Sequence, residues 1–251
     1  MKKTLSLILA LMMVLVLFAA CGEKDPEHQT YEEYMATEDG KDVTILSYVQ
    51  YKTPYSADYK NASLYLADET GAYYVYRVNF ETQADYDAVP VGAKVLVKGL
   101  KGIWSGEHEV AEGSATVEVI GKETKKMAAK EIAANATAAD LEKDMNKLVA
   151  MKGAVVASSS MKDPANSSAT IESAFLYKWD GSGSQGDDIY FNIVFNGTTY
   201  NFVVETDVSN KDSDAYKAVE ALKVGDKIDL EGFMYWYNGA QMQVTACKKA
   251  Q

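Results

Sequence analysis

The side chains best suited to metal or acid-base chemistry are a histidine and its two acidic neighbours. His108 lies between Glu107 and Glu109, and an imidazole with carboxylates is a ligand set that zinc accepts. Adjacent residues of a strand point to opposite faces, so only an alternate set could converge on one ion. The other histidine, His28, lies in a distant polar segment. The pattern therefore favours ordinary strand residues, and we predict no metal.

Carboxylates, the ligands that calcium prefers, gather at two further places. Around a turn lie Glu205, Asp207, Asp212 and Asp214, and around a Gly/Ser-rich stretch lie Asp180, Asp187 and Asp188. Neither group fits the twelve-residue calcium loop, which needs glycine at its sixth position and an acid at its twelfth. No nucleophile elbow, phosphate-binding glycine loop or HExxH motif occurs. We therefore predict no catalytic residue and no cofactor, and we favour a binding protein over an enzyme.

The N-terminus carries an export pattern that ends at a cysteine. Lys2 and Lys3 precede an apolar run from Leu5 to Ala20, followed by Cys21. The segment resembles a bacterial lipoprotein signal, although Phe18 replaces the leucine usual three residues before the cysteine. A membrane-spanning helix is the alternative, but such a helix needs about 20 apolar residues. The resemblance implies that residues 1–20 are removed and that Cys21 is lipidated, which anchors the chain to the extracytoplasmic face of the cell membrane.

The rest of the chain is acidic. The full sequence has 25 basic and 36 acidic residues, and loss of Lys2 and Lys3 with the signal leaves a net charge of −13. Residues 30–122 carry 8 basic and 15 acidic side chains, and residues 147–251 carry 10 and 13. Nucleic-acid binding normally relies on a basic groove that neutralises phosphates. The charge therefore makes a nucleic-acid partner less favourable than a neutral one.

An internal repeat indicates two related modules. Val91–Gly99 reads VGAKVLVKG and Val224–Gly232 reads VGDKIDLEG, with apolar residues two apart as a half-buried strand requires. The alternating apolar pattern of residues 41–49 returns at 147–155, and each nonamer is followed by a small turn, Ser105-Gly106 or Asn238-Gly239. We divide the chain into a signal (1–20), a tether (21–29), module 1 (30–122), a helical linker (123–146) and module 2 (147–251).

Each module is predicted to contain five strands with a helix before the fourth. In module 1 the strands are Val43–Tyr51, Ser63–Ala67, Tyr73–Phe80, Lys94–Ile103 and Glu109–Val119, with a helix at Glu81–Val89. In module 2 they are Leu148–Ser158, Asp188–Phe195, Thr199–Thr206, Lys227–Trp236 and Gln241–Lys248, with a helix at Ser213–Leu222. The inserted segment Met161–Asp187 is predicted to be a mobile loop.

This element order is that of the OB-fold, a small five-stranded barrel with its helix between strands three and four. The nonamer, followed by an aromatic residue and Asn/Ser-Gly, resembles the OB modules of bacterial secreted proteins, including some extracellular nucleases. The resemblance covers residues 30–251 and implies a mainly β protein with two tandem barrels. It also implies a binding module, because the fold alone does not fix the ligand.

Strand alternation predicts which side chains form the core and which form a ligand face. The predicted core residues are Leu64, Leu66, Tyr74, Tyr76 and Val78 in module 1, and Phe191, Ile193, Phe195, Tyr200, Phe202 and Val204 in module 2. The predicted ligand-binding residues are Tyr65, Tyr73, Arg77, Trp104, Tyr190, Trp236 and Tyr237. Ordinary surface aromatics are the alternative interpretation, since strands favour tyrosine.

Aromatic faces in an acidic protein favour some partners over others. A glycan or a protein of the cell envelope is the predicted partner, together with the membrane through Cys21. Single-stranded nucleic acid is the alternative ligand, because bases also stack on aromatic rings. A structural adaptor in an envelope complex is the third possibility. Salt dependence separates them, since phosphate contacts weaken steeply as salt rises.

Overall fold

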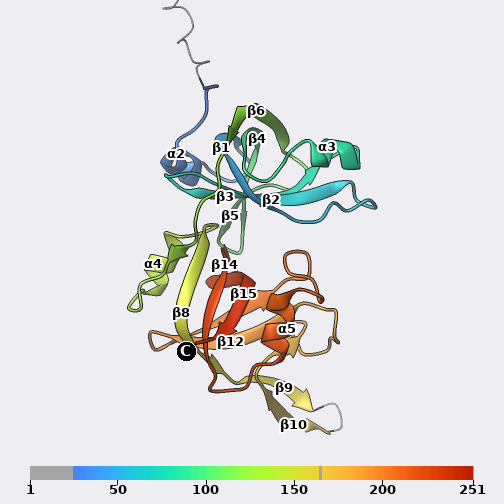
Figure 1. Ribbon diagram of the computed structural model, residues 1–251, viewed down its shortest axis with the longest axis vertical. Coiled ribbons are helices and arrows are strands. Elements are labelled where there is room, and N and C mark those ends of the chain that lie inside the picture. The colour runs from blue at the N-terminus through green and yellow to red at the C-terminus, as the bar shows by residue number, and fades with distance from the viewer. Residues whose placement is uncertain (1–24, 164–165, 251) are drawn as a thin grey trace, which may run out of the picture.

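A computed structural model describes residues 25–163 and 166–250 of the chain. It contains two β-barrels stacked along the long axis of the molecule, with the N-terminal segment leaving from the far end of the first barrel (Figure 1). Among the described helices, none has the length and apolar character needed to cross a membrane. The predicted signal segment and Cys21 lie outside the described residues.

The first barrel closes through five strands and matches the predicted fold. Its elements are α2 (Tyr31–Ala36), β1 (Asp42–Lys52), β2 (Asn61–Ala67), β3 (Ala72–Asn79), α3 (Gln83–Asp87), β4 (Ala93–Trp104), β5 (Glu107–Val110) and β6 (Thr116–Thr124). The strands pair in the order β1-β2-β3-β5-β4, and β4 returns to β1. The β3–β5 pair is parallel and the others are antiparallel. This is an OB-fold-like barrel with its helix α3 between the third and fourth strands.

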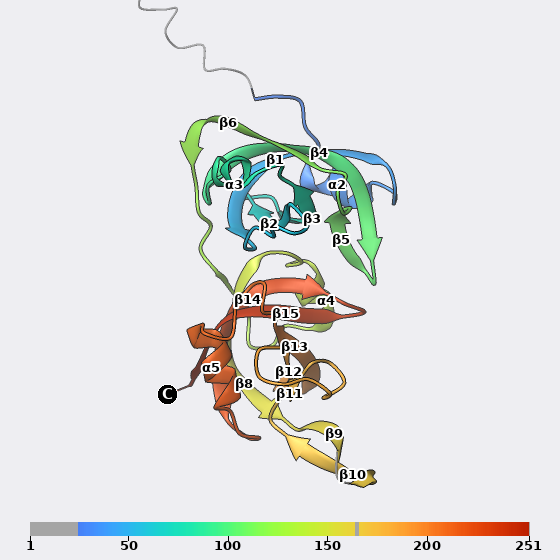
Figure 2. The same cartoon turned by 90° about the vertical axis from the view of Figure 1, so that its right-hand side faces the viewer.

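The second barrel repeats this topology. Its elements are β7 (Lys130–Glu131), α4 (Ala138–Glu142), β8 (Leu148–Ala157), β9 (Ser159–Asp163), β10 (Asn166–Ser173), β11 (Leu176–Tyr177), β12 (Ile189–Phe195), β13 (Thr198–Val204), α5 (Asp214–Glu220), β14 (Lys227–Trp236) and β15 (Ala240–Lys249). The barrel closes in the order β8-β12-β13-β15-β14-β8, again with one parallel pair, β13–β15. The predicted fold class of two tandem OB-fold-like barrels is therefore confirmed (Figure 2).

Local sequence signals set the turns and the helix starts. Asn196 and Gly197, which connect β12 to β13, both have positive φ angles, as the tight hairpin turn requires. Thr82 and Ser213 each accept a backbone hydrogen bond from the third residue of the helix that follows, and thereby cap α3 and α5. Both helices lie where the sequence predicts them, but each is shorter than predicted by less than one turn at each end.

Each of the two repeated nonamers ends in a glycine, and at both glycines neighbouring strands approach closely. A Cβ atom on Gly99 would lie 2.6 Å from a Val110 methyl group, and one on Gly232 would overlap the backbone of Gln243. The chain of β14 also shifts register between Glu231 and Gly232. A side chain at either position would force the neighbouring strands apart, so both positions require glycine.

The predicted alternation of module 1 is wrong at the end of β3. Tyr73 and Val75 pack in the barrel core together with Val78, so the spacing between inward-facing residues changes from two to three. The change occurs at Arg77, whose φ of 46° marks a bulge opposite a register shift in β2. Strict alternation counted back from Val78 ignores this bulge, and it therefore places Tyr74 in the barrel core instead of Tyr73.

The predicted alternation of module 2 is confirmed. All six residues predicted to face inward, Phe191, Ile193, Phe195, Tyr200, Phe202 and Val204, belong to the core of the second barrel. Strand β12 has a strict alternation of buried and half-buried residues over its whole length. No bulge interrupts its pairing with β13, so the period of two carries through both strands.

Three predicted segments differ from the structure. The fifth strand of module 1 ends at Val110 and a separate strand begins at Thr116, because the chain turns at Gly113, which has a φ of 66°. The linker is helical only over Ala138–Glu142. The segment predicted to be a loop contains the β9–β10 hairpin, which projects from the far end of the second barrel (Figure 1).

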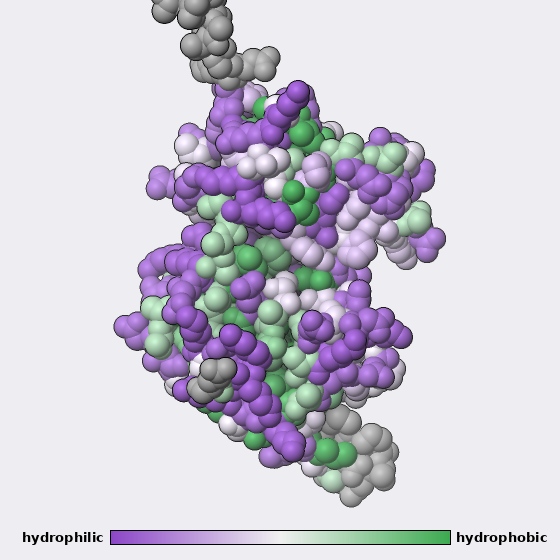
Figure 3. Space-filling view, viewed as in Figure 1, coloured by the Kyte–Doolittle hydropathy of each residue, from purple (hydrophilic) through white to green (hydrophobic). Residues whose placement is uncertain are grey.

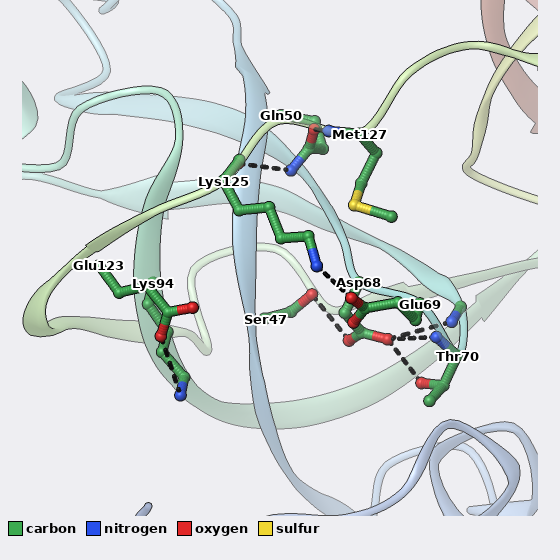
Figure 4. A network of polar contacts seen from close by, with 10 residues as sticks. Ser47, Gln50, Asp68, Glu69, Thr70, Lys94, Glu123, Lys125 and Met127 are labelled. Atoms are coloured by element: carbon green, nitrogen blue, oxygen red, sulfur yellow. Dashed lines mark hydrogen bonds and ion pairs between the residues drawn. The ribbon is translucent and has the colours of Figure 1, made fainter. Parts of the chain in front are cut away.

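The start of the linker is fixed to the first barrel. The Gln50 side chain donates to the Lys125 carbonyl at 3.4 Å and accepts from the Met127 backbone N–H at 2.7 Å. Lys125 also forms an ion pair with Glu69 at the β2–β3 turn (Figure 4). These contacts replace the intrahelical hydrogen bonds that the predicted linker helix would have had, and they hold the strand-like exit from β6.

A candidate ligand-binding cleft between the barrels

Aromatic rings from both barrels form a buried cluster where the barrels meet. Tyr65 of β2 stacks on Phe233 of β14 with ring centroids 4.0 Å apart and an interplanar angle of 9°. The ring centroid of Tyr74 lies 4.8 Å from that of Tyr65, and Tyr74 contacts Tyr235 edge-on with the centroids 5.7 Å apart. Tyr65 also donates a 2.5 Å hydrogen bond to Oε1 of Gln243. The outer face of β2 and β3 is therefore an interface between the barrels.

A buried carboxylate links the same two barrels next to this aromatic cluster. Glu107 of β5 has no exposed surface, and it accepts hydrogen bonds from Nδ2 of Asn146 at 2.6 Å and from the Trp236 backbone N–H at 2.8 Å. Burial raises the pKa of Glu107 to about 8, although these two donors favour its charged form. The carboxyl thus connects the first barrel with the linker and with β14.

The tips of two hairpins meet at the edge of the interface. The Asn238 backbone N–H donates to the Ser105 carbonyl at 2.7 Å. Gly106 lies against the Trp236 ring, so that a Cβ atom there would be 2.8 Å from Cδ1. Both tips are the small turns that follow the repeated nonamers in the sequence. The repeat therefore brings its two copies of this turn into contact.

Beside the aromatic cluster the barrels leave an open cleft of about 900 Å³. Six aromatic residues line it, namely Tyr55, Tyr59, Tyr74, Tyr76, Trp104 and Tyr235. Five carboxylates line it as well, namely Glu109, Glu112, Asp188, Glu205 and Asp207. Hydrophilic residues cover most of the face seen in Figure 3, and pale and green residues appear at the narrow part between the barrels. The cleft thus combines ring surfaces with hydrogen-bond acceptors.

The charge of this cleft is strongly negative. Arg77 is the single cationic residue among the described residues that line it, and its guanidinium already binds Glu112 at 2.9 Å. Burial raises the pKa of Glu109 and of Glu205 to about 7, and neighbouring carboxylates raise both further. Both are desolvated acids, and the cleft is a region of negative potential.

The structure places the seven predicted ligand residues in three different environments. Arg77 and Trp104 line the cleft, and Trp104 is 61% exposed. Trp236 and Tyr237 belong to the β14–β15 hairpin at its edge, and half-buried Tyr190 lies near Glu205 and Tyr237. Tyr65 and Tyr73 are 1% and 2% exposed, so the prediction that they face solvent is wrong. Tyr65 is covered by Phe233, and Tyr73 belongs to the barrel core.

Several residues of the cleft escaped the sequence analysis. Tyr76, predicted to be core, is half-buried and lines the cleft with Tyr235. The bulge at Arg77 is the reason, and the αL conformation of a non-glycine residue leaves no clear sequence signal. In the sequence, Glu205 and Asp207 suggest only calcium ligation, whereas the structure places both in the cleft. Alternation along β14 marks Tyr235 as a neighbour of Tyr237 on the same side, and this signal could have found it.

The segment Glu107-His108-Glu109 does not form a metal site. Glu107 faces the second barrel, Glu109 faces the cleft, and Nδ1 of His108 is buried without a hydrogen-bond partner. Burial lowers the pKa of His108 to about 4, so it is neutral at pH 7. In the described part of the chain, no three His, Cys, Asp or Glu side chains are grouped closely enough to hold a metal ion.

No family model matches the sequence, and no curated protein matches it. The chain spans about a quarter of the solved asparaginyl-tRNA synthetase from Pyrococcus horikoshii (22% identity, 41% of this chain and 24% of that chain, TM-score 0.32). It is also similar to a murine DNA-binding protein bound to double-stranded DNA (13% identity, 84% and 100%, TM-score 0.38). A third likeness is to the Ifi202 HINa domain in complex with 20-bp double-stranded DNA (14% identity, 76% and 84%, TM-score 0.33). At these TM-scores the likenesses carry no argument about the ligand.

Proposed function

We propose that this protein is a membrane-anchored, extracytoplasmic binding protein that takes an oligosaccharide in the cleft between its barrels. The lining of the cleft carries the proposal. Sugar rings offer apolar C–H faces that pack on aromatic rings, and hydroxyl groups that donate to carboxylates. Tyr76, Tyr235 and Trp104 supply ring surfaces, and Glu109 and Glu205 supply acceptors. A cleft of about 900 Å³ is also within the usual size range of ligand sites.

The charge of the cleft argues against a polyanion. A nucleic acid gains most of its affinity when lysines and arginines replace the counterions of its phosphates. The described lining has one arginine, already paired with Glu112, and four further carboxylates. Phosphates entering this cleft would meet repulsion, whereas a neutral or cationic ligand would not. The aromatic rings are therefore better matched to sugars than to bases.

An array experiment tests the proposal directly. A protein comprising residues 22–251 is applied to an array of oligosaccharides and single-stranded oligonucleotides at about 50 and about 300 mM salt. We expect a set of oligosaccharides to be retained at both salt concentrations, because the stacking of sugar rings on aromatic side chains is only weakly screened by salt. Retention of oligonucleotides that collapses at high salt would replace the proposal by nucleic-acid binding. Binding to neither, with co-purification of an envelope protein, would indicate an adaptor.

The membrane anchor is a separate part of the proposal. The described chain begins at residue 25, at the end of the first barrel that lies away from the second (Figure 1), so an anchor at Cys21 would attach on the side of the molecule away from the second barrel. We expect Cys21→Ala to move the protein from the membrane fraction to the soluble or secreted fraction, because the acyl chains provide the apolar anchor. Fractionation measures this, and unchanged membrane recovery of Cys21→Ala with residues 1–20 still attached would contradict lipidation.

A further inference from the structure

Two glutamates of β5 point to the same side of the strand but have different environments. Glu107 is satisfied by Asn146 and by the Trp236 backbone. Glu109, two residues further on, is 8% exposed and lies in the wall of the cleft. Among the described residues it has neither a hydrogen-bond donor nor an ion-pair partner for its carboxylate. A buried carboxylate without a partner carries a desolvation cost that a suitable ligand group would remove.

Backbone pairing fixes Glu109 in this orientation. Glu109 lies opposite Tyr74 in the parallel β3–β5 pair and opposite Gly102 in the β4–β5 pair. Gly102 has no side chain, and the Cγ of Glu109 occupies that space, 3.1 Å from where a Cβ would be. The carboxylate is thus held at the cleft wall by two neighbouring strands. This makes it a rigid acceptor, unlike a mobile surface glutamate.

The opposite wall and the rings around it suit a positive charge. Glu205, just after β13, lines the same cleft with Asp188 and Asp207. Tyr76 and Tyr235 lie beside these acids, and the face of a tyrosine ring attracts a cation. The one cation nearby in β4, Lys101, is not available to the ligand side, because its Nζ is buried over the Tyr34 ring at 3.4 Å. Lys101 and Arg77 therefore offset the negative charge only in part, and the described lining of the cleft keeps a net negative charge.

We propose that the ligand carries a primary ammonium group that binds against Glu109, so the oligosaccharide taken by the cleft contains free amino sugars. This inference rests on the proposed function and narrows its ligand class. An ammonium group supplies three donors and one positive charge, which would satisfy Glu109 directly. An N-acetylated sugar keeps the ring faces and hydroxyl groups but loses the charge. The two forms therefore separate the contribution of Glu109 from that of the aromatic rings.

Calorimetric titration with two tetrasaccharides tests this inference. A glucosamine tetramer and its fully N-acetylated counterpart are titrated into residues 22–251 at 150 mM salt. The same titrations are repeated with Glu109→Gln and with a control, Glu118→Gln, at an exposed position of β6 that does not line the cleft. We expect the amino tetramer to bind about tenfold more tightly than the acetylated one, since a hydrogen bond between two charged groups is stronger than one to a neutral group. Glu109→Gln should remove most of this preference, and Glu118→Gln should preserve it.

The outcomes distinguish failure of this inference from failure of the proposed function. Equal binding of both tetramers by the unchanged protein would overturn the ammonium site and leave oligosaccharide binding intact. A preference that survives in Glu109→Gln, with an unchanged melting temperature, would also overturn it. Tight binding of a tetralysine peptide without binding of either sugar would reject the saccharide ligand altogether. Absence of binding to both tetramers and to the array would contradict the proposed function itself.

Discussion

The outer faces of the second and third strands differ sharply between the two barrels. In the first barrel this face carries the cross-strand pair Tyr65–Tyr74, which is buried against Phe233. In the second barrel the corresponding pair is Asn192–Asn201, joined by a 2.9 Å side-chain hydrogen bond, and Asn201 is exposed. The repeat preserves the inward pattern of both barrels. The outward residues have diverged, and one face has become the interface that shapes the cleft.

This difference changes the role of the tyrosines of the first barrel. An OB-fold binds many of its ligands on the face of strands two and three, and here barrel one uses that face to hold barrel two. The cleft forms beside the covered surface, with walls from both barrels. Neither barrel alone contains both Glu109 and Glu205. The binding site is therefore a property of the pair of barrels.

Replacing Tyr65 should have the largest effect on stability. Tyr65→Ala removes a ring stacked at 4.0 Å on Phe233 and leaves Gln243 without its 2.5 Å hydrogen bond. We expect the free energy of unfolding to fall by about 3–5 kcal/mol, as for other large buried aromatics. Asn201→Ala, on the matching face of the second barrel, should cost about 0.5 kcal/mol or less.

Urea denaturation of both variants measures this contrast. Similar destabilisation by Tyr65→Ala and Asn201→Ala would show that the two outer faces are equivalent, and would remove the basis for an interface on β2 and β3. The transition of the intact protein also reports on cooperativity between the barrels. Independent folding of residues 30–122 and 127–251 stays a prediction, and exposure of Tyr65 and Tyr74 in the isolated first module should lower its stability.

The fold was more predictable than the site, and the reasons are local. Alternation along β12 and β13 identified six core residues correctly, because no bulge interrupts those strands, but it did not include Ile189 at the start of β12. Alternation along β3 failed at Arg77, where a positive φ adds a residue to the period. Tyr65 was correctly placed outside the barrel core, but a strand pattern cannot show that another domain covers that face. The same limit hid the cleft itself, since Glu109 and Glu205, which both line it, belong to different barrels.

Replacing Glu107 should have the next largest effect on stability, and this effect depends on pH. Burial raises its pKa to about 8, so the folded protein favours the protonated acid relative to the unfolded chain. The resulting stability is fully present below the ordinary glutamate pKa and is lost as pH rises through about 8. We expect stability to fall between pH 5 and pH 8, and Glu107→Gln to reduce that fall by about 3 kcal/mol.

Denaturation curves of the unchanged protein and Glu107→Gln at pH 5, 6, 7 and 8 give this difference. Glu109 and Glu205 titrate in the same direction, and Lys101, whose pKa burial lowers to about 7, opposes them above pH 7. All three groups are present in both proteins, so the difference between the two curves reports Glu107 together with its electrostatic coupling to Glu109 and Lys101. Parallel curves across this range would mean that the carboxyl is not buried between the barrels.

The central claim is that the cleft between the barrels holds the ligand, and the affinity of two tryptophan variants tests it most directly. Trp104 is 61% exposed in the cleft, and Trp179 is 70% exposed in the insertion outside it. With an oligosaccharide retained on the array, we predict that Trp104→Ala weakens binding by about 2 kcal/mol, roughly thirtyfold, at an unchanged melting temperature. Trp179→Ala should bind like the unchanged protein. Loss of binding in Trp179→Ala together with full affinity in Trp104→Ala would contradict the assignment and move the site to the insertion of the second barrel.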